Sequence, residues 1–163
     1  MVEVAKPKLR VYKPPNTRTG DVGGKLSVFL AGSIEMGKAE DWQTKLQKRL
    51  LDKSVVLFNP RRDDWDSSWK QTIEDTNFLG QVTWEYNHLC KADLVFMYFD
   101  PATQSPISLM ELGMFAESKD MIVVCPDGFW RKGNVEFVCK QFDIPLFNSF
   151  DEGVEELLNK YVN

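Results

Sequence analysis

Four short apolar runs, separated by segments with helical spacing, limit what this chain can fold into. The runs span residues 26–31, 55–58, 93–99 and 121–125, and they are largely apolar on both faces rather than alternating with polar residues. Strands of this kind are typical of a parallel sheet buried on both sides, and such strands need helical crossovers. We therefore expect an α/β domain with helices on both faces of a parallel sheet. The expected helices span residues 40–52, 81–91, 106–116, 134–142 and 150–161.

Length and composition predict one domain with a small extension. The chain has 163 residues, of which 43% are hydrophobic, enough to bury a core. Residues 1–24 are rich in proline and glycine, so we expect an extended N-terminal arm, followed by one domain over residues 25–163.

Charge and cysteine content exclude several classes of protein. The net charge of −4 argues against a polynucleotide partner, because binding to a phosphate backbone needs clustered cations. No apolar run approaches the roughly 20 residues that span a membrane, and the N-terminus lacks the apolar stretch of a signal peptide. Three cysteines without CxxC spacing favour free thiols over a redox centre. We expect a cytoplasmic protein.

Glu111 is the most distinctive candidate for chemistry. In open parallel sheets, ligands bind beyond the carboxyl ends of the strands, and Glu111 follows the third apolar run. Its neighbours are Leu109, Met110 and Leu112, where a carboxylate is costly unless it is paired or used. The alternative is an ordinary glutamate near a helix N-terminus, facing solvent.

Further carboxylates belong to the same rim. Cleavage of a glycosidic bond needs one carboxylate as nucleophile and a second acid to assist the leaving group. Glu85 is either that second acid or a solvated helix residue. Asp93 begins a strand, at the opposite end of the sheet, so we expect it to have a structural role.

A polar and aromatic loop over residues 61–80 follows the second apolar run. It is either a wall that stacks on and hydrogen-bonds a ligand base or a salt-bridged surface loop. Two tryptophans within so polar a segment favour ligand contact. The candidate binding residues here are Asn59, Arg61, Arg62, Asp64 and Trp65.

Gly32 and Ser33 follow the first apolar run, in the position of a phosphate-binding turn. No GxGxxG or GxxxxGK[ST] motif accompanies them, so an ordinary turn is the alternative. His88 is the only histidine, which argues against a histidine-based triad or metal site. We expect neither a metal nor a cofactor.

Four segments together resemble the nucleoside 2-deoxyribosyltransferase family, which includes deoxynucleoside 5′-monophosphate N-glycosidases. They are VFLAGSI at 28–34, FNPRRDDW at 58–65, WEYNHLCKAD at 84–93 and SPISLMELG at 105–113. The resemblance covers roughly residues 26–160 and implies a flavodoxin-like three-layer sandwich with a five-stranded parallel sheet. It also implies that Glu111 is the nucleophile, forming a covalent glycosyl–enzyme intermediate, and that Glu85 is the acid near the base.

Two departures from the family bear on activity and substrate. Phe29 stands where the family often has a tyrosine that orients the nucleophile, so either another group such as Tyr98 supplies the hydroxyl or catalysis is slower. Ser105 stands where members acting on nucleosides carry an aspartate and members acting on monophosphates carry serine. A hydroxyl beside a helix N-terminus suits a phosphate, so with Ser33, Arg61 and Arg62 in reach a 5′-monophosphate substrate is a hypothesis.

The family also implies an oligomer. A polar residue after the fourth strand usually completes the site of a partner subunit, and Asn134 occupies that place. We expect a homodimer or larger assembly that binds a small nucleoside or nucleotide. Three alternatives stay open: a non-catalytic nucleotide-binding or sensing module, a glycohydrolase of NAD-type nucleotides, and a flavodoxin-like cofactor carrier.

Overall fold

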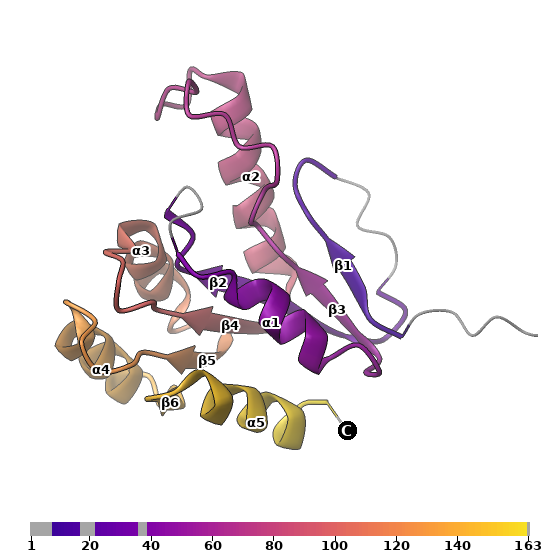
Figure 1. The fold of residues 1–163 in the computed structure, drawn as a ribbon, viewed down its shortest axis with the longest axis vertical. Coiled ribbons are helices and arrows are strands. Elements are labelled where there is room, and N and C mark those ends of the chain that lie inside the picture. The colour runs from indigo at the N-terminus through magenta and orange to yellow at the C-terminus, as the bar shows by residue number, and fades with distance from the viewer. Residues whose placement is uncertain (1–7, 17–21, 36–38, 163) are drawn as a thin grey trace, which may run out of the picture.

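The computed structural model describes residues 8–16, 22–35 and 39–162, and within them six parallel strands form one sheet (Figure 1). The strand order is β1-β3-β2-β4-β5-β6. The strands are β1 (Arg10–Tyr12), β2 (Leu26–Gly32), β3 (Val55–Phe58), β4 (Leu94–Tyr98), β5 (Asp120–Val124) and β6 (Leu146–Phe147).

The sheet contains the expected five strands and one more. From β2 onwards the strands follow the order 2-1-3-4-5, which is the flavodoxin-like order. The additional strand, β1, lies in the segment expected to be an arm outside the core, and it pairs with β3, with Arg10 opposite Val56. For residues 10–12 this corrects the expectation of an arm outside the core, because three half-buried residues at a sheet edge are too few to produce a periodic apolar signal. Residues 1–7 and 17–21 of the expected arm lie outside the described residues.

All five expected helices are present. They are α1 (Trp42–Arg49), α2 (Thr76–Lys91), α3 (Pro106–Phe115), α4 (Lys132–Gln141) and α5 (Phe150–Lys160). The second begins earlier than expected because the Asp75 side chain accepts hydrogen bonds from the backbone N–H groups of Asn77 and Phe78. No helix in the described part of the chain is long and apolar enough to cross a membrane.

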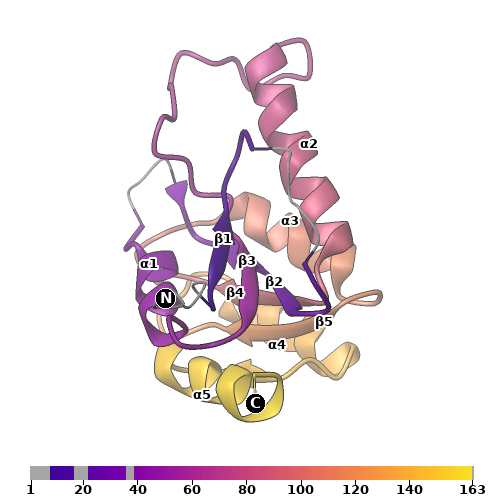
Figure 2. The ribbon, with the colours of Figure 1, turned by 90° about the vertical axis from the view of Figure 1, so that its right-hand side faces the viewer.

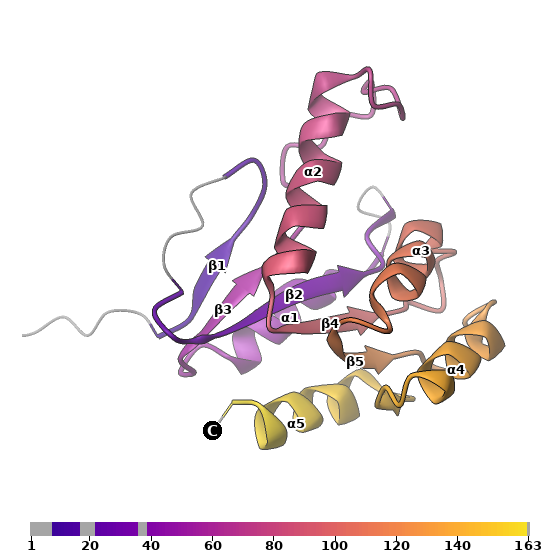
Figure 3. The same cartoon turned by 180° about the vertical axis from the view of Figure 1, so that it is seen from behind.

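The helices form two layers. Helices α1 and α5 cover one face of the sheet, where Trp42, Leu46 and Val154 are fully buried (Figure 1). Helices α2, α3 and α4 cover the other face, as the view from behind shows (Figure 3). One end of α2 extends well beyond the sheet (Figure 2), so this part of the helix does not lie over any strand.

The three cysteines are free, as expected. Cys125 and Cys139 are buried in the core beneath α4, and burial raises the pKa of their thiols to about 11 and about 12. Both side chains therefore stay protonated at neutral pH, which argues against the redox role considered as an alternative.

Candidate active site

A cavity of about 1140 Å³ lies beyond the carboxyl ends of β2, β3 and β4, between α2 and α3. Neighbouring strands β2 and β4 are where the strand order reverses, and in open α/β sheets ligands bind at this switch point. Of the expected site residues, the cavity is lined by Gly32, Arg61, Arg62, Trp65, Glu85, Ser105 and Glu111. Ser33, Asn59, Asp64 and Asn134 do not line it.

Glu111 lies in the second turn of α3 and faces the cavity. The chain enters the helix through Ser105, whose φ of 47° turns the backbone, and through Pro106 at the first helical position. The next residue, Leu112, is buried in the core, so the helix presents Glu111 on the side toward α2. Burial raises the pKa of the Glu111 carboxyl to about 8, and the nearby Glu85 carboxylate adds to that rise. Glu111 is therefore not a solvated surface glutamate.

Glu85 faces the same cavity from α2. Gln81, one turn earlier, donates from Nε2 to Glu85 Oε1 at 2.7 Å and also to the carbonyl oxygen of Pro60 at 3.2 Å. Burial raises the pKa of the Glu85 carboxyl, and the hydrogen bond from Gln81 opposes that rise. Two carboxyls that each favour a proton therefore share one cavity, an arrangement that suits acid and nucleophile chemistry.

Arg61 lines the cavity, but its guanidinium group is already bound by the protein. It donates to the carbonyl oxygens of Ala39 and Glu40 and to Gln43 Oε1, each at 3.2 Å. The Asn59 side chain accepts a hydrogen bond from the Arg61 backbone N–H at 3.0 Å. Asn59 is fully buried, and its role in the structure is to hold this turn.

Arg62 and the two tryptophans form a connected wall. Arg62 pairs with both carboxylate oxygens of Asp64, at 2.9 and 3.0 Å, and lies over the ring of Trp69. Trp65 packs edge-on against Trp69 with ring centroids 5.1 Å apart. Trp65 lines the cavity, and its buried indole N–H has no hydrogen-bond partner among the described residues. This loop therefore contains both a salt bridge, between Arg62 and Asp64, and an aromatic side chain that lines the cavity, that of Trp65.

Gly32 lines the cavity at the end of β2, and Ser33 lies next to it outside the lining. Gly32 has a φ of 133°, and a Cβ there would lie 2.1 Å from the carbonyl oxygen of Tyr98, so only glycine fits. The hydroxyl of Ser33 lies 2.5 Å from that of Ser105 and 2.9 Å from that of Thr103, and all three side chains are buried. The two serines therefore hydrogen-bond each other and fasten the end of β2 to the start of α3.

Glu35 is a cavity residue that the sequence analysis missed. Its Oε1 atom accepts hydrogen bonds from the backbone N–H groups of Gln104 (2.6 Å) and Ser105 (2.8 Å), at the start of α3. These donors are the ones to which the monophosphate hypothesis assigned a phosphate. An acidic residue two positions after Ser33, beyond a strand end, was the signal that could have identified it.

The family tyrosine has no replacement at Tyr98. Phe29 is buried against Trp84, with ring centroids 6.3 Å apart, on the face that carries the cavity. Tyr98 packs on Trp42, with centroids 5.6 Å apart, on the opposite face of the sheet. The suggestion that Tyr98 orients the nucleophile is therefore wrong. Tyr86 of α2 does line the cavity.

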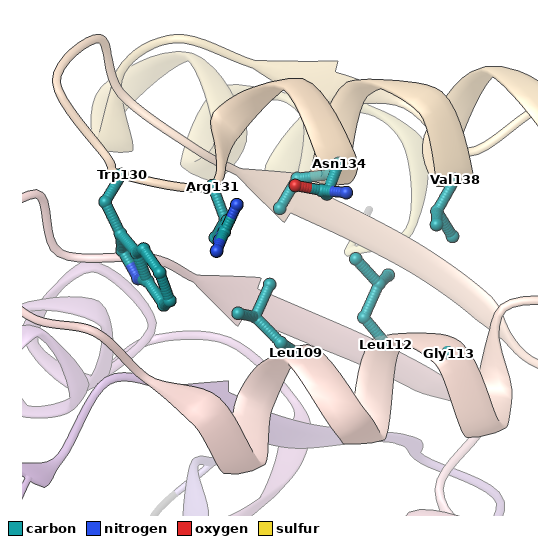
Figure 4. Close-up of a pocket in the computed structure, with 8 residues that line it drawn as sticks. Leu109, Leu112, Gly113, Trp130, Arg131, Asn134 and Val138 are labelled. Atoms are coloured by element: carbon teal, nitrogen blue, oxygen red, sulfur yellow. The ribbon is translucent and has the colours of Figure 1, made fainter.

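Asn134 lies in a separate pocket of about 300 Å³ between α3 and α4 (Figure 4). In this pocket Asn134 and Arg131 of α4 face Leu109 and Leu112 of α3. The indole N–H of Trp130 closes one end by donating to the carbonyl oxygen of Gln104 at 2.8 Å. Asn134 therefore does not reach the cavity of its own chain.

Two other polar residues have structural roles, as expected. Asp93 Oδ2 accepts hydrogen bonds from the backbone N–H and the hydroxyl of Ser27, both at 2.9 Å, at the amino end of the sheet. His88 is buried and stacks on Trp84 with ring centroids 3.9 Å apart, while its Nδ1 atom lies 2.6 Å from the Trp84 carbonyl oxygen.

Comparisons with known proteins point in the same direction as this geometry. A family model described as nucleoside 2-deoxyribosyltransferase like matches residues 25–129, which include both Glu85 and Glu111. The crystal structure of a conserved protein from Enterococcus faecalis V583 is similar, with a TM-score of 0.58 and 13% identity. That match covers 82% of this chain and 97% of the other, and at this identity it shows the fold alone. A search of curated proteins finds no match.

Proposed function

This chain belongs to the nucleoside 2-deoxyribosyltransferase-like family, and on that premise we propose that it cleaves or transfers an N-glycosidic bond through Glu111. The substrate is a nucleoside or a nucleoside 5′-monophosphate. The family suggests glycosyl transfer in general, and the residues of the cavity support the more specific assignment. The observation that carries it is the pair of half-buried carboxyls with raised pKa values, Glu111 and Glu85, which face one cavity from two helices.

In the first step, a carboxylate oxygen of Glu111 attacks the anomeric carbon of the sugar. The bond between that carbon and the base nitrogen breaks, and its electron pair goes to the base. Glu85 delivers its proton to the departing base, which leaves a sugar ester on Glu111. In the second step, water or a second base attacks the anomeric carbon, gives its proton to the Glu85 carboxylate and releases Glu111.

The raised pKa values suit this division of labour. The pKa of Glu111 is raised to about 8, the pKa of Glu85 is also raised, and the two carboxyls interact, which disfavours ionising both at once. The reactive form has Glu111 ionised and the proton on Glu85. Positive charge that develops on the sugar favours the ionised Glu111, and a base nitrogen that accepts from Glu85 favours the protonated acid.

A second copy of the chain would complete the site. Ile107, Met110 and Met114 of α3 line the cavity and are more than half exposed, at 56%, 54% and 52%. Asn134 lies outside the cavity of its own chain, in the position that the family uses to reach a partner's site. Light scattering should therefore give the mass of a homodimer or a larger assembly. A monomeric mass would contradict this part of the proposal.

The central test is release of free base. Wild-type protein is incubated with ribo- and deoxynucleosides and their 5′-monophosphates, with and without an acceptor base, and the products are separated by chromatography. Glu111→Gln should lower base release by at least about 10³-fold, because the nucleophile is lost. Glu117→Gln is the matched control, since Glu117 is exposed just beyond the same helix. Base release that survives in Glu111→Gln would refute the assignment, and binding without release would indicate a sensing module.

A further inference from the structure

The sugar-facing end of the cavity is distinguished by a carboxylate where an anion would otherwise bind. Glu35 accepts two hydrogen bonds from backbone N–H groups at the start of α3, those of Gln104 and Ser105. N–H groups at a helix N-terminus are the usual binding site for a phosphate. Here the protein's own carboxylate occupies the two N–H groups that lead into the helix, so a substrate phosphate that used them would have to displace it.

The two arginines of the cavity do not compensate for this carboxylate. Arg61 donates to two backbone carbonyls and to Gln43, and Arg62 is paired with Asp64. An arginine that is committed in this way offers little to a phosphate unless those bonds break. The hypothesis that Arg61 and Arg62 receive a 5′-phosphate therefore loses its physical support.

The charge of the lining adds to the same effect. The acidic side chains of Glu35, Glu85 and Glu111 line the cavity, and a fourth one there, that of Asp63, is paired with Lys13. A phosphate monoester carries nearly two negative charges at pH 7, so a carboxylate beside it is strongly unfavourable. A sugar hydroxyl, by contrast, is an uncharged donor that a carboxylate accepts well.

Glu35 and Glu111 line the same cavity, Glu35 from the turn after β2 and Glu111 from α3. Glu35 is bonded to the N–H of Ser105, the residue just before α3. Among the residues that the structure describes, no donor is bonded to the second oxygen of Glu35, so Oε2 is available to a ligand hydroxyl.

We infer that Glu35 selects the substrate by accepting a hydrogen bond from a sugar hydroxyl, so that the enzyme uses unphosphorylated nucleosides. This inference rests on the proposed function for the reaction itself. Glu35, in the turn after β2, then takes over the role of the aspartate that nucleoside-using family members carry at the position of Ser105. Ser105 then serves to hold that turn against α3 through its hydrogen bond to Ser33.

The kinetic test compares kcat/KM for each nucleoside and its own 5′-monophosphate. Wild-type protein should prefer the nucleoside by at least about 100-fold. Glu35→Gln keeps the shape and an acceptor oxygen but removes the charge, and it should reduce that preference at least tenfold. A purely structural role for Glu35 would lower both values alike and leave their ratio unchanged, which would overturn the inference. Equal use of both substrates by the wild type would also overturn it.

A binding test separates this inference from the proposed function. Calorimetry with Glu111→Gln protein measures the Kd of the same nucleoside and monophosphate without turnover, and the Glu111→Gln, Glu35→Gln double variant is the comparison. The nucleoside should bind at least tenfold more tightly than the monophosphate, and the double variant should lose that difference. Equal binding, or no binding of the nucleoside, would overturn the role of Glu35. Turnover that persists in Glu111→Gln would refute only the assignment of Glu111 as nucleophile. The preference for the nucleoside over its 5′-monophosphate could still be measured and would still test Glu35.

Discussion

The two faces of the sheet are covered by helices in a similar way, but they bury different groups. Under α1 and α5, the rings of Trp42, Phe96 and Tyr98 pack with centroids about 6 Å apart, and the Trp42 indole N–H donates to the Ser33 carbonyl oxygen. Under α2 and α3, the cavity holds the carboxyls of Glu85 and Glu111 instead. Both faces bury an apolar core, but only the cavity face also holds two carboxyls whose pKa values are raised by burial.

The largest effect should follow from changing the acid on the cavity face. Glu85→Gln removes the proton donor, so kcat/KM should fall by ~10²–10⁴-fold. It also removes the group whose ionisation sets the basic limb of the pH–rate profile, so that limb should flatten. Glu117→Gln is the control. A basic limb that persists unchanged in Glu85→Gln would show that another group supplies the proton.

The opposite face should respond in stability and not in catalysis. Leu46 is fully buried beneath α1, and Leu46→Ala should lower the free energy of unfolding by about 2–5 kcal/mol, measured by urea denaturation. The kcat/KM of the folded fraction should change by no more than a few-fold. Leu51→Ala, at a position 65% exposed, should change stability by less than about 0.5 kcal/mol. A large loss of turnover in folded Leu46→Ala protein would contradict the claim that the face under α1 and α5 does not affect catalysis.

Removing the nucleophile should stabilise the protein. Folding raises the pKa of Glu111 from 4.5 to about 8, so the folded state binds more protons between those values, and stability falls as pH rises through them. Glu111→Gln removes this penalty and should increase the free energy of unfolding by about 1–3 kcal/mol at pH 8. At pH 5 the gain should be much smaller, because the wild-type carboxyl is then protonated. Equal gains at both pH values would contradict the role of burial.

The smallest effect should lie at the amino end of the sheet. Asp93→Asn weakens the two hydrogen bonds to Ser27 and should cost about 1 kcal/mol of stability without changing kcat/KM. Asp120→Asn is the matched control, since Asp120 is exposed at the start of β5. A selective loss of turnover in Asp93→Asn would contradict the proposal that the active site lies at the carboxyl ends of the strands.

The sequence predicted β2 to β5 and the helices well, because these strands are short continuous apolar runs and the helices have apolar residues at helical spacing. It missed β1, since three residues at an edge have no pattern to detect. It also placed Asn59, Ser33 and Asp64 at the ligand, because residue type and position at a strand end do not reveal which way a side chain turns. Each of the three is instead engaged within the protein: Asn59 with Arg61, Ser33 with Ser105, and Asp64 with Arg62.

Two further features depended on contacts between distant segments. Glu35 reaches the backbone of Gln104, 69 residues away, and nothing local in the sequence indicates that pairing. Tyr98 and Phe29 lie on neighbouring strands, but their side chains point to opposite faces of the sheet. A strand alternates its faces residue by residue, so register decides which tyrosine can approach the nucleophile.

By itself, the sequence determined the fold class, the edge of the sheet where the cavity lies, and Glu111 as the leading candidate for chemistry. Apolar runs that alternate with helices leave few other topologies, and a carboxylate among apolar residues at a strand end has few other uses. Only the tertiary structure decided that Glu85 lies close enough to raise the pKa of Glu111, and that Glu35 occupies the start of α3. Electrostatic and hydrogen-bond interactions depend on distance in space, which the order of residues along the chain does not specify.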